Sequence, residues 1–105
     1  MVLKLFLSSL FNNQILYDEL SLLDEEVSLS DQSMLLKEDL FQVQSFDGLC
    51  LLDVGWYPEF DMKGYFEVKV IRKYDWENPI FIKRTSDIQS LKQILIECKS
   101  LLNTE

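Results

Sequence analysis

The spacing of hydrophobic and polar positions divides the chain into a helical first third, a stretch of strands and a closing helix. Over residues 1–37, apolar side chains recur at helical spacing, which predicts mostly helical structure. Asn12 and Asn13 interrupt this pattern, so they are expected to end one helix and to cap another. One helix in place of two is the alternative. Residues 24–35 lose the periodicity and are expected to form a loop with a short helical turn.

From residue 39 onward the period changes to the alternation that is typical of strands. The second of four such runs is apolar on both faces, which favours a central position in the sheet. Asp47 and Gly48 form a strong hairpin-turn signal between the first two runs. Pro79 opens the fourth run, where its missing N–H is tolerated. The expected strands are residues 39–46, 49–56, 65–74 and 79–84.

The closing segment, residues 86–103, has the clearest helical pattern. Ser86 and Gln89 resemble a capping box, and Asp87 favours the positive start of the helix. One apolar stripe runs along this helix and is expected to face the core. It consists of Ile88, Leu91, Leu95, Cys98 and Leu102.

Together these elements predict one α+β domain over residues 1–105. Residues 38–85 are expected to form a four-stranded antiparallel meander, on which the C-terminal helix and the helical N-terminal segment pack. The rings of Trp56, Phe60, Phe66 and Phe81 are expected in the core, because sheet proteins of this size use aromatic rings for packing. Successive connections of a meander lie at opposite ends of the sheet. The loops 57–64 and 74–79 are therefore expected at opposite ends.

Net charge narrows the range of partners. The chain has 18 acidic and 10 basic residues and no histidine, a net charge of −8. Residues 1–62 hold twelve of the acids but only Lys4 and Lys37, so this part has a net charge of −10 and the remainder +2. Such a balance argues against direct binding to nucleic acid or to an anionic membrane, and it favours a basic protein partner.

Cys50 and Cys98 lie in apolar contexts, so we expect two buried free thiols and no disulfide or metal site. The opening segment has a short apolar run that two serines interrupt, and no small-residue cleavage site follows it. No stretch approaches the ~20 apolar residues of a membrane span. A cytoplasmic protein without a cofactor is therefore expected.

Catalysis is the first functional class to weigh, because Glu59 and Asp61 stand close together among aromatic residues. An acid–base pair needs one carboxyl group with a raised pKa, which requires burial, whereas this pair lies on an expected loop beside Lys63. Without histidine, no Ser-His or Cys-His pair is available. We expect a protein that is not an enzyme. The rival hypothesis is a small hydrolase that uses Glu59 and Asp61 for catalysis.

Two loop motifs carry a resemblance to a known family. "LLDVGWYPEFD" with "MKGYF" after it, and "DWENPIF" before the final helix, are similar to small bacterial immunity proteins of contact-dependent growth inhibition and polymorphic toxin systems. The resemblance covers residues 48–102, and residues 1–37 have no recognisable counterpart. Met62 stands where glycine or proline commonly follows the "EFD" turn, so the resemblance does not define the geometry of that turn.

The resemblance implies an immunity protein that binds a cognate toxin, a basic nuclease, and covers its active site with an acidic surface. Free of its partner, such a protein is expected to be a monomer. The alternative is a non-catalytic interaction or adaptor module that self-associates through an exposed sheet edge. The expected partner-binding residues are the acids Asp24, Glu25, Glu26, Glu59, Asp61, Asp75 and Glu77, with Tyr57 and Trp76 as aromatic anchors.

Overall fold

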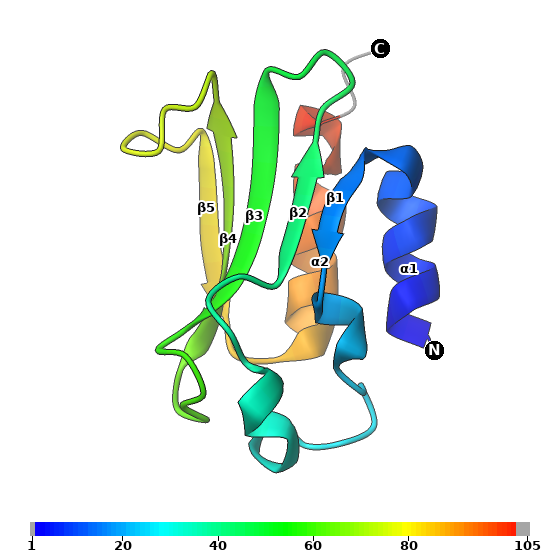
Figure 1. Ribbon diagram of the computed structural model, residues 1–105, viewed down its shortest axis with the longest axis vertical. Coiled ribbons are helices and arrows are strands. Elements are labelled where there is room, and N and C mark those ends of the chain that lie inside the picture. Colours follow the sequence, from blue (N-terminus) through cyan, green and yellow to red (C-terminus); the bar gives the residue numbers. More distant parts are fainter. Residues whose placement is uncertain (1, 103–105) are drawn as a thin grey trace.

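The computed structural model describes residues 2–102, which form a five-stranded antiparallel sheet and two α-helices (Figure 1). The strands lie in the order in which they follow one another along the chain, so the predicted α+β meander is confirmed and contains one strand more than expected. The elements are α1 (Val2–Phe11), β1 (Ile15–Asp18), β2 (Phe41–Gln44), β3 (Cys50–Tyr57), β4 (Tyr65–Arg72), β5 (Phe81–Thr85) and α2 (Ile88–Cys98).

Strand β3 lies at the centre of the sheet, as its two apolar faces predicted. Its residue Val54 pairs with Phe41 of β2 on one side and with Val68 of β4 on the other. Because side chains alternate along a strand, Leu52, Val54 and Trp56 all point to one face, and all three are fully buried there. This face forms the core of the protein.

Helix α2 covers the core face with the predicted apolar stripe, of which Leu91, Leu95 and Cys98 are fully buried. The helix begins one residue later than predicted, because its N-cap is Asp87 and not Ser86. The Asp87 carboxylate accepts a hydrogen bond of 2.7 Å from the backbone N–H of Ser90. Within residues 2–102, no helix has the length and apolar character needed to cross a membrane.

The N-terminal third departs from its helical prediction after α1. Helix α1 ends at Phe11, and Asn12 follows with a left-handed backbone (φ 42°), as the interruption by asparagine indicated. The next residues form the edge strand β1, which pairs with β2 through Tyr17 and Gln42, and not a second α-helix. An edge strand satisfies backbone groups of β2 that a local helix would leave without partners.

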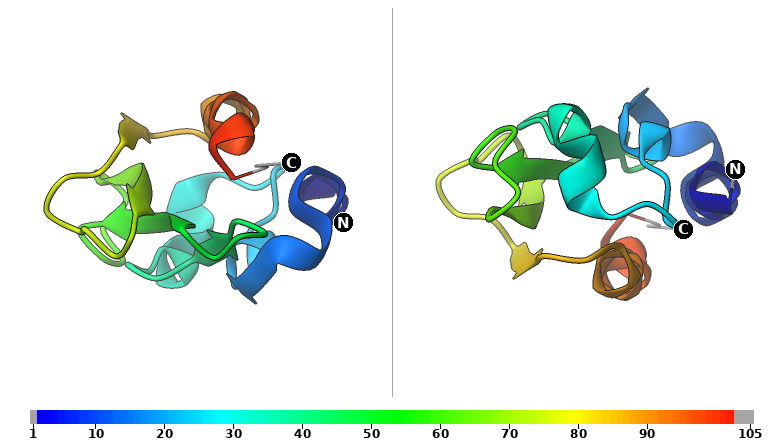
Figure 2. Two further views of the ribbon diagram at one scale, coloured as in Figure 1. Left: turned by 90° about the horizontal axis from the view of Figure 1, so that it is seen from above. Right: turned by 90° about the horizontal axis from the view of Figure 1, so that it is seen from below.

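Short 3₁₀ helices connect β1 to β2, including η2 (Leu20–Leu22) and η3 (Leu29–Leu35). Glu19 and Leu20 both donate backbone hydrogen bonds to the carbonyl oxygen of Leu40, at 2.7 and 2.9 Å. Figure 2 shows α2 on one side of the sheet, and no helix within residues 2–102 lies over the opposite face of β3 and β4. This uncovered face points toward the viewer in Figure 1.

Candidate functional site

The structure divides the predicted binding residues between the two ends of the sheet. The β3–β4 turn lies at the same end as η3, whereas the β4–β5 turn lies at the opposite end (Figure 1), as the meander predicted. The predicted residues therefore form two separate groups rather than one cluster. Asp24, Glu25, Glu26, Tyr57, Glu59 and Asp61 lie near the first end, and Asp75, Trp76 and Glu77 lie at the second.

In the β4–β5 turn, Asp75 has a structural task. Its carboxylate oxygens lie 3.3 Å from the side-chain amide nitrogen of Asn78, which donates to them. Lys73 and Tyr74 both have left-handed backbones, with φ of 54° and 63°, and reverse the chain just before it. Trp76 remains 45% exposed and lies against Lys69, whose ammonium group is 5.9 Å from the ring centre.

In the β3–β4 turn, Asp61 also holds the chain in place. Its carbonyl oxygen accepts a hydrogen bond of 2.7 Å from the indole of Trp56, and its carboxylate accepts one of 2.9 Å from the backbone of Lys63. Glu59 accepts from the backbone N–H of Glu38 at 3.3 Å. Asp61 therefore shapes the turn and Glu59 joins it to the segment before β2.

Phe60 corrects the expectation that its ring belongs to the core. The side chain is 40% exposed, and its backbone is left-handed with φ 66°, which is rare for a bulky residue. The hydrogen bond from its N–H to the carbonyl oxygen of Leu36 (2.7 Å) holds this conformation. The other rings follow the prediction more closely, since Trp56 and Phe66 are fully buried and Phe81 is partly buried against the core.

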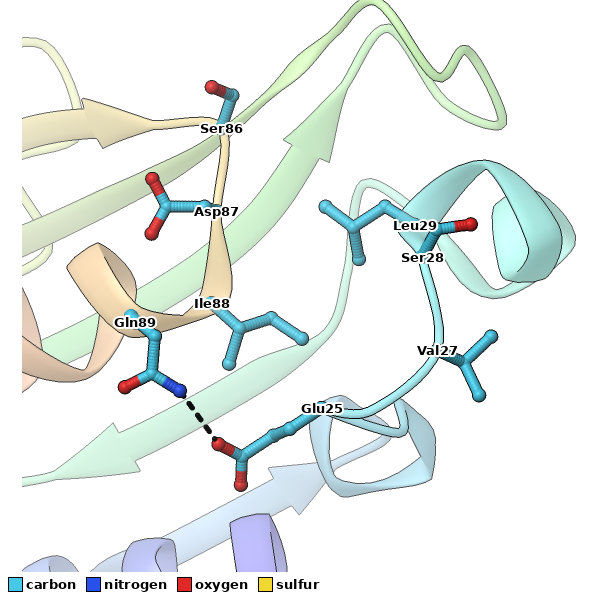
Figure 3. Close-up of a pocket in the computed structure, with 8 residues that line it drawn as sticks. All are labelled: Glu25, Val27, Ser28, Leu29, Ser86, Asp87, Ile88 and Gln89. Atoms are coloured by element: carbon cyan, nitrogen blue, oxygen red, sulfur yellow. Dashed lines mark hydrogen bonds between the residues drawn. The ribbon is translucent and has the colours of Figure 1, made fainter.

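Glu25 is already paired within the protein. Its carboxylate binds Lys92 of α2 at 2.5 Å and Gln89 at 3.2 Å, and its side chain is only 12% exposed. Together with Ser28 and Asp87, it lines a cleft of about 380 Å³ between the 25–29 segment and the start of α2 (Figure 3). Glu25 therefore ties this segment to α2 and offers little charge to a partner.

Asp24 and Glu26 stay at the surface on a loop that the side chain of Gln32 fixes. The Gln32 amide donates to the carbonyl oxygens of Asp24 and Val27, at 2.9 and 3.0 Å, and accepts from the N–H of Asp24 at 2.9 Å. Asp24 in turn accepts from the N–H of Glu26 at 2.9 Å. The loop presents its carboxylates in one defined conformation.

The uncovered face of the sheet gathers further carboxylates that are not among the predicted binding residues. Asp53 lies at its centre, in a row across the strands with Gln42 on β2 and Lys69 on β4. Its residue surface is only 7% exposed, and the Gln42 amide donates to it at 3.1 Å. Burial raises the pKa of the Asp53 carboxyl, and the charge of Asp39 adds to this rise, whereas the bond from Gln42 opposes it.

The next row contains Gly55 and Glu67, and Glu67 is neutralised within the sheet. Arg84 of β5 donates to its carboxylate at 2.9 Å, and the Lys69 ammonium group lies 3.5 Å from it. The Arg84 guanidinium also lies 5.2 Å from the centre of the Tyr65 ring. On the β4–β5 side, acids and bases of this face are therefore paired.

The segment before β2 brings two more carboxylates onto this face. Trp56 donates its backbone N–H to Lys37, and Leu40 donates to Val54, so Glu38 and Asp39 form a bulge between these two bonds. The bulge lies over Gly55, because a Cβ atom there would be only 2.0 Å from the carbonyl oxygen of Glu38. Glu38 and Asp39 are both exposed.

The hydroxyl group of Tyr57 donates to the carbonyl oxygen of Glu38 at 3.4 Å and lies within the electrostatic influence of four carboxylates, those of Glu38, Asp39, Asp53 and Glu67. Burial, and then the negative charge of these groups, raise the pKa of Tyr57 to about 12. A shallow hollow of about 470 Å³, lined by Leu16, Tyr17, Asp39 and Gln42, adjoins them. We name Glu38, Asp39, Asp53, Tyr57 and Glu67 the acidic face.

The sequence contained a signal for part of this site. Asp53 interrupts an otherwise apolar central strand, which marks an unusual carboxylate. The alternation of β4 also places Glu67 and Lys69 on one side of the sheet. The bulge at Glu38 and Asp39 could not be found in this way, because it depends on a contact with the distant Gly55.

Comparisons with known proteins leave the function to be argued from this geometry. No family model matches the chain, and no curated protein or solved structure matches it either. Within residues 2–102, no three acidic, cysteine or histidine side chains are grouped so that they could hold a metal ion. The acidic face is the one site in which burial, shifted pKa values and unpaired charge come together among the described residues.

Proposed function

We propose that this protein is an immunity protein that binds a basic toxin domain in the cytoplasm and neutralises it by covering the active site. The observation that carries the proposal is the acidic face, where Glu38 and Asp39 expose their carboxylates beside the buried Asp53. A nuclease holds phosphate groups with lysine and arginine side chains, so a surface of carboxylates can occupy the same groups.

The arrangement of charge over the molecule supports the same reading. Because the strands lie in chain order, the strongly acidic residues 1–62 form β1, β2, β3 and the segments around them. The basic residues gather on β4, β5 and α2, where Lys83, Arg84 and Lys92 each pair with a glutamate. Negative charge left without an internal partner thus concentrates on one side, as electrostatic steering of a basic partner requires.

Aromatic side chains at the edge of this surface supply apolar contact area. Tyr57 lies within the acidic face, and the exposed Phe60 stands next to Glu59 in the adjoining turn. Tyrosine and tryptophan often anchor protein interfaces, because they bury large areas and still offer a polar group. Trp76 lies toward the other end of the same face, against Lys69. A partner that covers the acidic face would meet these rings at its margin.

The test is the rate of association with the toxin domain that the proposal expects to be encoded next to the gene for this protein, measured by stopped flow. Steering predicts that the rate falls by more than about tenfold between low and high ionic strength. Reversal of the two exposed charges in E38K/D39K should slow association at low salt. The matched double variant D75K/E77K, at the other end of the sheet, should have a much smaller effect. A rate that does not depend on salt would contradict the proposal.

The second candidate is an adaptor module that self-associates through strand β5. Ile80 and Ile82 are 49% and 46% exposed beside this edge, which favours contact with another chain. Lys83 and Arg84 oppose it, because two copies of the edge would bring like charges together. Sedimentation velocity separates the candidates: we expect a monomer for the free immunity protein, and a constitutive dimer that an I82K substitution dissolves for the adaptor.

A further inference from the structure

Asp53 differs from the other shielded carboxylates of the protein. Glu25 and Glu67 each have side chains about as well buried, and each pairs with a cationic side chain. Asp53 is more than nine-tenths buried as a residue, yet the ion pairs among residues 2–102 do not include it. The nearby Lys69 instead binds Glu67 and lies over the ring of Trp76.

The hydrogen bonds of Asp53 leave part of the carboxylate for an outside donor. Gln42 donates to the Oδ1 atom, and within the described residues the Oδ2 atom accepts no hydrogen bond from a side chain. Among the described residues, the buried side-chain oxygen that lacks a hydrogen-bond partner is Oε2 of Glu25. The Oδ2 atom of Asp53 is therefore not sealed in the interior. A largely buried carboxylate with one oxygen still reachable gains most from a donor with positive charge.

The surroundings of Asp53 fit a planar cation on a long stem. Gln42 joins Asp53 to the hollow that Leu16, Tyr17 and Asp39 also line. The leucine and tyrosine side chains can pack against methylene groups. The Asp39 carboxylate lines the hollow, and the Asp53 carboxylate adjoins it behind Gln42, so that a group with several N–H donors would be needed to reach both. A guanidinium group has five N–H donors in one plane, whereas an ammonium group concentrates its charge at one point.

We propose that the hollow beside Asp53 binds an arginine side chain of the partner protein, whose guanidinium group bridges the carboxylates of Asp39 and Asp53. The identity of the partner as a toxin rests on the proposed function, but the arginine site itself does not. Bidentate pairing of this kind fixes orientation as well as charge, so the site would set the register in which the two proteins meet.

The experiment uses N-acetyl-arginine amide as the probe and follows the backbone and side-chain amide signals of the ¹⁵N-labelled protein by NMR at low ionic strength. Saturable shifts are expected for Gln42 and for the backbone of Asp39 and Asp53. The neutral analogue N-acetyl-citrulline amide should produce none. Shifts spread evenly over all acidic loops, or no saturable shift at all, would overturn the proposal.

Two substitutions test the assignment to these side chains. D53N keeps the shape of the residue and should weaken probe binding by about tenfold, the effect of one charged hydrogen bond. D39N, on an exposed residue, should weaken it severalfold without a risk to folding. The matched control D75N should leave binding unchanged. Equal affinity of D39N, D53N and the unaltered protein would show that the carboxylates do not form the site.

Failure of this inference can be told from failure of the proposed function. If the probe binds at Asp53 but the neighbouring toxin domain does not bind the protein, the arginine site stands and the immunity function is refuted. If the toxin domain binds with the same affinity to D53N as to the unaltered protein, the function stands and the arginine site is refuted. The two measurements therefore give independent answers.

Discussion

The carbonyl oxygen of Glu38 occupies the space that a side chain at position 55 would need. A Cβ atom on Gly55 would lie 2.0 Å from this oxygen and 2.9 Å from the carbonyl carbon. Both atoms belong to the backbone and cannot turn aside as a flexible side chain could. The glycine thus allows the bulge at Glu38 and Asp39 to cross β3, which places both carboxylates on the uncovered face.

Substitution G55A is therefore expected to destabilise the protein by roughly 3 kcal/mol, as overpacking against fixed atoms does. The free energy of unfolding in urea measures the effect. The matched control is G48A, since a Cβ there would have only the Gln44 side chain nearby, at 3.8 Å. Its left-handed backbone (φ 75°) should cost about 1 kcal/mol. Similar losses for the two variants would contradict the close approach at Gly55.

The left-handed backbone of Phe60 predicts an unusual order of stability for two variants. In F60A the unfavourable conformation remains and the contacts of the ring are lost. In F60G the same contacts are lost, but glycine adopts this backbone without penalty. F60G should therefore be more stable than F60A by about 1 kcal/mol, even though alanine is normally the better residue.

Thermal and urea unfolding of both Phe60 variants measure this difference. F60A with stability equal to or above that of F60G would mean that the turn relaxes out of the left-handed conformation. Since the ring is exposed, both variants should also bind the partner less tightly than the unaltered protein does, if Phe60 contributes apolar contact area.

The raised pKa of Asp53 predicts that D53N is more stable than the unaltered protein at neutral pH. A carboxyl whose pKa is higher in the folded than in the unfolded state stabilises the folded state while protonated. This contribution is fully present below the ordinary aspartate pKa of about 3.9 and is lost as the pH rises through the raised value. The advantage of D53N should therefore shrink as the pH falls through that window.

Urea unfolding of both proteins at a series of pH values gives this difference, and the other titrating groups cancel in it. An advantage of the unaltered protein that grows toward neutral pH would mean that the folded state lowers the pKa of Asp53. A gain in stability together with a loss of partner binding in D53N would indicate a carboxylate kept for binding at a cost in stability.

The ion pair of Glu25 and Lys92 predicts strong coupling in a double-mutant cycle of E25Q and K92M. The side chains are only 12% and 16% exposed, so removal of one partner leaves the other charge in a poorly hydrated place. The coupling energy should be roughly 2 kcal/mol. The exposed pair of Lys83 and Glu97 is the control, and its coupling should stay below about 1 kcal/mol. Equal coupling in the two cycles would refute the tethering role of Glu25.

The sequence predicted the elements whose pattern depends on a single face or a local turn. The alternation of β2 and β4, the turn at Gly48 and the apolar stripe of α2 each reflect neighbours close in the chain. The helical prediction for Ile15–Asp18 was wrong, because pairing with β2 decides this short segment. Periodicity over four residues cannot distinguish a strand from part of a helix.

The site was less accessible to prediction, because burial and pairing decide which carboxylates remain free. Glu25 and Asp75 look alike in sequence as loop acids, but Lys92 and Asn78 engage them in the fold. Asp53 belongs to the first of the two quoted motifs, but it lies in strand β3, and the predicted binding residues were taken from the loops. Charge counted along the chain indicates the acidic side of the molecule, whereas the fold decides which carboxylates on that side have internal partners, and the predicted binding residues remain a prediction.

The order of strands in the sheet also bears on how the chain folds during its synthesis. Each strand pairs only with its neighbours in the chain, so successive hairpins can form as they leave the ribosome. Helix α2 emerges after all five strands, and until then the core lacks Leu91, Leu95 and Cys98. The nascent sheet therefore passes through a stage with an open apolar surface, at which chaperone binding and aggregation compete with the docking of α2.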